Sequence, residues 1–266
     1  MNNDIEGGQC KILWHVGNIK TSHKDSKVVT AIIDLISSVY VREYQLTATH
    51  GKVHEYLGMT IDFSDKDKLK FTMYDCIVNM LEELPEDMKT GEAATPAGDH
   101  MFTINEDNPE KLNQEDTIMF HRVTAKMLYL ANRSRPDLQL GVNFLCTRMK
   151  ELDKDDCKKL TRVMRYIRST TGLPLILGID DTNMLCWYID AVFGVHRDMK
   201  SHTIMMMTMG QGASRSNSTK HKLNTKSSIK AELLGIDDEI SLIIWSGYFL
   251  SEQGYQVRDN ICYQDS

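Results

Sequence analysis

The sequence contains three carboxylates whose order and spacing could bring them together around one metal ion. Asp190 and Asp265 each close a short apolar run, and Glu232 lies between them in a segment with helical spacing. Ile229 precedes Glu232 by three residues and Ile236 follows it by four, so these side chains share one helix face. A carboxylate that faces a packed sheet is costly unless it is paired or bound to metal. Strand Asp, helix Glu and strand Asp can therefore converge on one divalent ion.

A structural interpretation of the same residues stays open on spacing alone. Asp190 and Asp265 can cap the strands that they follow, and Glu232 can pair with a lysine. Carboxylates are common at strand ends, because Asp is favoured where a strand passes into a turn.

A basic stretch lies between the first two carboxylates. From Arg197 to Lys230 the chain has seven Lys and Arg residues against one acid, Asp198. The whole chain has a net charge of −6, which argues against a dedicated nucleic-acid-binding protein. The stretch is therefore either a solvated surface or a local contact for a phosphate backbone.

Composition limits the class of protein. The chain has 266 residues, 41% hydrophobic and 26% charged, which suits one large or two ordinary folded domains. Its six cysteines form no C-x-x-C pair, so we expect neither a zinc site nor a disulfide framework. The first residues lack the regions of a signal peptide, and no apolar run approaches the roughly 20 residues of a membrane helix. We expect an intracellular protein, cytoplasmic or nuclear, that is not secreted and has no membrane partner.

Periodicity and turn residues predict the elements that must position these side chains. The N-terminal part should contain a strand pair over 10–19 broken at Gly17-Asn18, a helix from Asp25 or Ser26, a strand over 53–63 paired with 69–73, a helix over 75–84 and a polar linker over 86–109. The rest should contain helices over 114–133, from about 137 and over 153–168, strands over 174–179, 184–190, 203–209 and 213–218, a long helix over 227–252 and a last strand ending at Asp265.

Several short segments, in the same order along the chain, resemble the carboxy-terminal part of a copia-type LTR retrotransposon polyprotein. They are Tyr56-Leu57-Gly58-Met59, similar to the primer-grip hairpin; Ala94-Thr95-Pro96; the helical segment Leu128 to Asp137; and five segments similar to the start of a ribonuclease H domain, namely Tyr188 to Ala191, Lys200 to Thr203, Leu223 to Ser228, Ala231 to Leu233 and Tyr263 to Asp265.

The resemblance implies a multi-part fold of α+β and α/β type. Residues 1–97 would be the end of a reverse-transcriptase palm with a primer-grip and thumb remnant, and 98–172 a helical connecting segment. Residues 173–266 would form an incomplete ribonuclease H-like mixed sheet, truncated at its C-terminus, because the chain stops at Ser266 before the family's fourth carboxylate.

The resemblance also assigns roles to residues. Asp190, Glu232 and Asp265 match the family's metal carboxylates, which hold Mg²⁺ (or Mn²⁺) for two-metal hydrolysis of the RNA strand in an RNA–DNA hybrid. Contacts to the nucleic acid would come from the basic stretch and its hydroxyls, through Lys200, Ser201, Thr203, Lys220, Lys222 and Lys226. The remainder of the polyprotein would be a further partner.

Departures from the family pattern point to lost activity. Gly17 and Asn18 occupy the positions of the polymerase's paired aspartates, and neither can supply a carboxylate ligand. Near the ribonuclease H carboxylates, the unusual residues are Val192, Ile204, Ile229 and Lys230. Two functions are therefore expected as alternatives: a polymerase-dead fragment with a degenerate ribonuclease H site, or a non-catalytic retroelement remnant with weak or no nucleic-acid binding.

Overall fold

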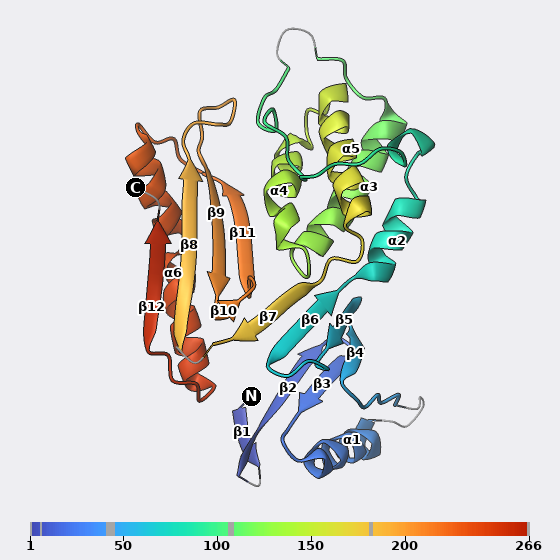
Figure 1. Cartoon of the computed structure of the whole chain (residues 1–266), viewed down its shortest axis with the longest axis vertical. Coiled ribbons are helices and arrows are strands. Elements are labelled where there is room, and N and C mark those ends of the chain that lie inside the picture. Colours follow the sequence, from blue (N-terminus) through green and yellow to red (C-terminus); the bar gives the residue numbers. More distant parts are fainter. Residues whose placement is uncertain (1, 6, 41–45, 106–108, 181–182, 265–266) are drawn as a thin grey trace.

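A computed structural model describes residues 2–5, 7–40, 46–105, 109–180 and 183–264. Within these ranges the chain forms six α-helices and three β-sheets (Figure 1). This mixed architecture agrees with the predicted multi-part α+β and α/β class. The assignment of its parts to a reverse transcriptase and a ribonuclease H stays a prediction.

The N-terminal sheet is a three-stranded antiparallel meander. It consists of β1 (Asn2–Ile5), β2 (Gly8–His15) and β3 (Asn18–Ser22), and α1 (Ser26–Tyr40) follows it. The predicted strand pair is present, but the turn consists of Val16 and Gly17 and not of Gly17 and Asn18, because β2 ends at His15 and β3 begins at Asn18, its partner in the register. Val16, in the turn, has a φ of 51°, which is strained for a β-branched residue.

The second sheet has the order β10-β7-β6-β5-β4, and all its pairs are antiparallel. Its strands are β4 (Val53–Tyr56), β5 (Met59–Asp62), β6 (Lys68–Thr72), β7 (Leu175–Ile179) and β10 (Gly210–Gln211). The expected single strand over 53–63 is wrong. Leu57 and Gly58 both have positive φ, 53° and 72°, and this favours a tight hairpin turn between two strands. β7 pairs with β6, so the first strand after residue 173 joins a sheet formed mainly by the N-terminal third of the chain.

A helical unit lies between β6 and β7 in the sequence. It contains α2 (Tyr74–Glu82), the 3₁₀ turn η1 (Glu86–Met88), α3 (Gln114–Ala131), the 3₁₀ turn η2 (Pro136–Leu138), α4 (Gln139–Arg148) and α5 (Lys154–Ser169). Its core includes Phe120, Leu145 and Leu160, none of which is exposed. Met88 and Met101 are buried in the same core, so the polar stretch expected to be a linker packs on the helices.

The third sheet has the order β11-β9-β8-β12 and carries the candidate carboxylates. Its strands are β8 (Met184–Val192), β9 (His202–Thr208), β11 (Arg215–Lys220) and β12 (Asp259–Gln264). β8, β9 and β11 form an antiparallel meander, and β12 returns parallel to β8 after the long helix α6 (Ser228–Glu252).

α6 covers one face of this sheet (Figure 1), where Trp187, Ile189 and Met205 pack with Ile243. Gly235 brings the helix close to the sheet, because a Cβ at this residue would lie 2.9 Å from Thr203 Oγ1. None of the helices in the described ranges combines the length and apolar character needed to cross a bilayer.

Candidate carboxylate site

Glu232 connects α6 to two neighbouring strands. Its Oε1 accepts a hydrogen bond from the backbone N–H of Ala191 at 3.2 Å, and its Oε2 accepts one from Gln264 Nε2 at 2.8 Å. The side chain is half-buried against the sheet. A single carboxylate thus contacts the residue after Asp190 on β8 and the last residue of β12.

Asp190 lies on the opposite face of β8 from the residues that pack on α6. Ile189 and Ala191 are buried and Asp190 is exposed, as expected from the alternation of side chains along a strand. Asp190 is opposite Ile204 in the register of β8 and β9. Asp265 lies outside the described residues, and Gln264 immediately before it is held by Glu232.

The donor chemistry suits a hard cation. Carboxylate oxygens are the ligands that Mg²⁺ and Mn²⁺ take in proteins. Within the described ranges, no three His, Cys, Asp or Glu side chains are placed to hold one ion. The grouping of Asp190, Glu232 and Asp265 therefore stays a prediction, and Glu232 is the residue that brings their three elements together.

Three of the four unusual residues near these carboxylates are solvent-exposed. Val192 is 42% exposed at the end of β8, and Ile229 is 71% exposed in the first turn of α6. Lys230 is exposed beside it, and Ile204 is half-buried opposite Asp190. A protruding apolar side chain at Ile229 contacts water one turn before Glu232 and supplies no polar contact for a substrate.

The lysines predicted to contact nucleic acid fall into two groups. Lys200 and Lys220 both pair with Asp198, with nitrogen–oxygen distances of 3.6 and 2.9 Å. Those pairs neutralise part of the local positive charge. Lys222 and Lys226, in the connection between β11 and α6, are exposed.

The two predicted hydroxyl contacts are inside the protein. Ser201 is fully buried, and its Oγ accepts a hydrogen bond from the backbone N–H of Gly194 at 3.2 Å. Thr203 is 4% exposed, and its Oγ1 is hydrogen-bonded to His221 Nε2 at 2.5 Å. Both hydroxyls therefore hold neighbouring segments in place, and any effect they have on a bound nucleic acid is indirect.

A buried histidine cluster beside the sheet was not predicted from the sequence. His196 Nε2 lies 3.0 Å from His202 Nδ1, and His202 Nε2 lies 2.6 Å from Ser218 Oγ. Both rings contact Phe102, and His196 also stacks on Phe144 of α4. The cluster therefore joins the helical unit to the third sheet. Alternation along β9 places His202 on the same face as Ile204 and exposed Met206, and His196 lies outside any strand, so the sequence pattern did not mark this cluster.

Burial keeps these histidines neutral. Burial is the largest cause that lowers the pKa of His196 to about 4 and that of His202 to about 3, and the positive charge of Lys220 contributes to both of these values. Burial also lowers the pKa of His221, against the opposing effect of Asp238 and Glu232. A neutral imidazole has one donor and one acceptor nitrogen, so each ring can donate one hydrogen bond and accept another along the series His196–His202–Ser218.

Gly17 and Asn18 lie at the tip of the β2–β3 hairpin. Asn18 begins β3, and a Cβ at Gly17 would have no atom within 4 Å, so the hairpin tip has open space around it. The described hairpin therefore presents an amide at one of the two positions and no side chain at the other.

Comparison with known proteins adds evidence of ancestry. No protein-family model matches the chain. Over 222 residues, 81% of this chain and 16% of the relative, it is 25% identical to a protein of Nicotiana tabacum described as "Retrovirus-related Pol polyprotein from transposon TNT 1-94". The chain is similar to transposon polyproteins. A second relative, the putative transposon Ty5-1 protein of Saccharomyces cerevisiae, is 25% identical over 164 residues, 61% of this chain and 52% of that protein.

The chain spans 16% of the tobacco relative and about half of the yeast one. The similarity supports a segment of a retrotransposon polyprotein, and this agrees with the coarse part of the resemblance seen in the sequence. The copia type, the domain limits and the site residues stay predictions.

Proposed function

We propose that this chain is the polymerase-dead end of a copia-type retrotransposon reverse transcriptase joined to a degenerate ribonuclease H site. The observation that carries the proposal is the position of Glu232. Its carboxylate contacts Ala191, next to Asp190, and Gln264, next to Asp265. Three candidate ligands thereby come from one strand end, one helix and a second strand end, the order expected of the family.

Sheet topology supports the same proposal. An antiparallel meander β8, β9, β11, followed by a helix and a strand parallel to β8, gives the order β11-β9-β8-β12. This connection brings the C-terminal ends of β8 and β12 to the same edge of the sheet; Asp190 is near the end of β8, and Asp265 follows Gln264, the last residue of β12, in the sequence. A carboxylate pair at such an edge is suited to a divalent ion.

When bound, Mg²⁺ or Mn²⁺ would supply charge neutralisation and water activation for phosphodiester hydrolysis. Asp190, from the exposed face of β8, and Glu232, from α6, would have to reach the ion around the end of the strands, together with Asp265. Gln264 and the Ala191 N–H fix the orientation of the Glu232 carboxylate. Lys222 and Lys226 would contact the backbone of an RNA–DNA hybrid. The exposed Ile229 and the neutralised Lys200 and Lys220 favour slow cleavage.

Replacing Glu232 with Gln tests the site with little change in shape. The amide retains an oxygen for the Ala191 N–H but loses the negative charge. We expect Mn²⁺ to raise the melting temperature of the wild-type chain and not that of Glu232→Gln, because only an ion bound to the folded state stabilises it. Cleavage of an RNA–DNA hybrid, where measurable, should fall at least about 100-fold.

Glu239→Gln is the matched control on the same helix. Glu239 is 7% exposed and accepts a hydrogen bond from Asn217 Nδ2 at 2.9 Å. Loss of the Glu239 charge should not change the rise in melting temperature that Mn²⁺ produces. If Mn²⁺ stabilises neither the wild type nor Glu239→Gln, the chain is a non-catalytic remnant. Equal stabilisation of the wild type and Glu232→Gln would show that the ion binds elsewhere.

Primer extension tests the other half of the proposal. Because Gly17 and Asn18 bring no negative charge to the β2–β3 hairpin, we expect no nucleotide incorporation on a primed template with Mg²⁺ or Mn²⁺. The measurement is extension of a labelled primer, resolved by gel electrophoresis, with an active reverse transcriptase as positive control. Incorporation that copurifies with the chain through several columns would contradict the assignment.

A further inference from the structure

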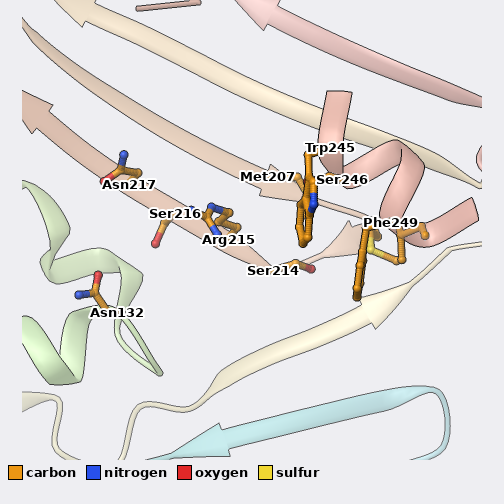
Figure 2. A pocket seen from close by; sticks show the side chains of 11 residues that line it. Asn132, Met207, Ser214, Arg215, Ser216, Asn217, Trp245, Ser246 and Phe249 are labelled. Atoms are coloured by element: carbon orange, nitrogen blue, oxygen red, sulfur yellow. The ribbon is translucent and has the colours of Figure 1, made fainter. Parts of the chain in front are cut away.

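A pocket lies far from the carboxylate site, on the C-terminal half of α6. The pocket has a volume of about 600 Å³ and is formed by α6, β11 and the end of α3 (Figure 2). Trp245 lies 13 residues after Glu232, so the two are about 20 Å apart along the helix at 1.5 Å per residue. Its lining includes Asn132, Arg215, Asn217, Trp245 and Phe249.

The pocket has an aromatic wall that is open to solvent. Trp245 and Phe249 are one helical turn apart and stack with ring centres 4.9 Å apart and planes inclined by 17°. They remain 55% and 44% exposed. Figure 2 shows Trp245 between Phe249 on one side and Arg215 on the other. One face of the indole is thus covered by Phe249, and its other side is directed toward a cation.

The remaining wall combines Met207, Met209 and Leu250 with polar side chains, one of which is positively charged. Arg215 is exposed at the start of β11, and Asn217 follows two residues later. Asn217 Nδ2 donates to Glu239 Oε1, and Asn132 Oδ1 accepts from Gln139 Nε2 at 2.9 Å, so both amides are held in place. None of the lining residues, all within the described ranges, is Asp or Glu. The pocket therefore favours a ligand with a planar ring and a negative group.

We propose that this pocket binds one nucleotide of a single-stranded nucleic acid, with the base stacked against Trp245 and the phosphate on Arg215. Exposed aromatic rings beside basic groups are the usual means of holding single strands without sequence preference. Guanidinium groups bind phosphate oxygens in a bidentate manner. The volume is within the range of small-ligand sites and is large enough for a nucleotide. A duplex offers no free base face, so it should not use this pocket.

The test is binding of a fluorescein-labelled 12-nucleotide oligo(dT) to the full chain, followed by anisotropy in EDTA. Trp245→Leu and Arg215→Gln should each weaken binding about tenfold, from loss of one stacked base or one phosphate contact. Trp245→Phe and Arg215→Lys should lose less, because they keep a ring and a charge. Trp14→Leu is the matched control, since Trp14 is 76% exposed on β2.

Several outcomes decide the proposal. Oligo(dT) bound equally by the wild type, Trp245→Leu and Arg215→Gln would overturn it, as would failure of the wild type to bind at micromolar concentration. Binding of an acidic amphipathic peptide, lost in the same variants while oligo(dT) is not bound, would assign the pocket to a protein partner and also overturn it. Circular dichroism of each variant verifies folding. Because EDTA removes divalent ions, the result is independent of the carboxylate site.

Discussion

Arg148→Met should destabilise the protein by about 3–5 kcal/mol, because it leaves buried carboxylates without their cation. Arg148 Nε lies 3.1 Å from Asp156 Oδ1, and its Nη2 lies 3.9 Å from Asp153 Oδ2. Asp156 is 1% exposed and Asp153 is 3% exposed. Burial already raises the pKa of Asp156, and Arg148 opposes that rise. Without the guanidinium, burial and the neighbouring Asp153 both disfavour the charged form.

The measurement is urea denaturation at pH 7, with Arg122→Met as the matched control. The Arg122 side chain is 52% exposed, and its Nε lies as far as 3.8 Å from Glu83 Oε2. Loss of this exposed ion pair should therefore cost less than about 1 kcal/mol. The double variant Arg148→Met with Asp156→Leu removes both charges and should recover part of the stability. A cost for Arg148→Met no greater than that of Arg122→Met would show that the buried carboxylates do not depend on this cation.

This network also bears on the candidate site. Arg148 is the last residue of α4, and Phe144 lies one turn earlier and stacks on His196. Asp153 and Asp156 form the capping box of α5, in which each side chain accepts from the other's backbone N–H. The network therefore fixes α4 against α5, and α4 is a helix of this unit that contacts β11 of the third sheet. A loss here should loosen the contact between the helical unit and the sheet.

Local patterns predicted most elements because their causes are local. The helices α1, α3, α5 and α6 follow three- and four-residue apolar spacing, and Asn113, Asp153 and Ser227 cap three of them with hydrogen bonds to backbone N–H groups. The hairpin at Leu57-Gly58 was missed, because a leucine with positive φ is uncommon and the apolar run continues through the turn.

Long-range placement was beyond sequence patterns. β7 reads as the first strand of the C-terminal region, yet Leu177 is opposite Leu69 in the second sheet. A strand of this composition could pair with an edge of either sheet, so the residue types in β7 do not show which sheet it joins. Likewise, the carboxylates were found from their types and order, whereas the partners of Glu232, one backbone N–H and one amide, depend on how α6 crosses the sheet at Gly235.

The histidine cluster should make the protein sensitive to mild acid. His196 and His202 are 4% and 1% exposed, and their pKa values lie at about 4 and 3, below the value of about 6.5 expected in the unfolded chain. Below pH 6.5 the unfolded state therefore binds more protons than the folded state, and the free energy of unfolding falls as pH decreases. The contribution of the neutral histidines to the free energy of unfolding is fully present above about pH 6.5 and is lost progressively toward pH 4.

The groups that face the cluster set the size of the effect. Phe102 and Phe144 bring no charge from the helical unit, whereas Lys200 and Lys220 disfavour protonation and Asp198, paired with both lysines, favours it. At about 1.36 kcal/mol per pH unit, each histidine should reduce the free energy of unfolding by about 2 kcal/mol between pH 6.5 and 5. The range from pH 6.5 to 5 lies above the usual pKa values of Asp and Glu side chains.

Urea denaturation of the wild type and His202→Gln between pH 7.5 and 5 separates this effect from general acid sensitivity. Gln can still hydrogen-bond to Ser218 but does not titrate, so His202→Gln should be less stable at pH 7.5 and show a shallower loss toward pH 5. His121→Gln is the control, because His121 is exposed and hydrogen-bonded only to the Met149 carbonyl in the described structure. Its pH dependence should match the wild type. The decisive quantity is the slope: an equal slope in His202→Gln and the wild type would show that the buried cluster does not govern acid stability.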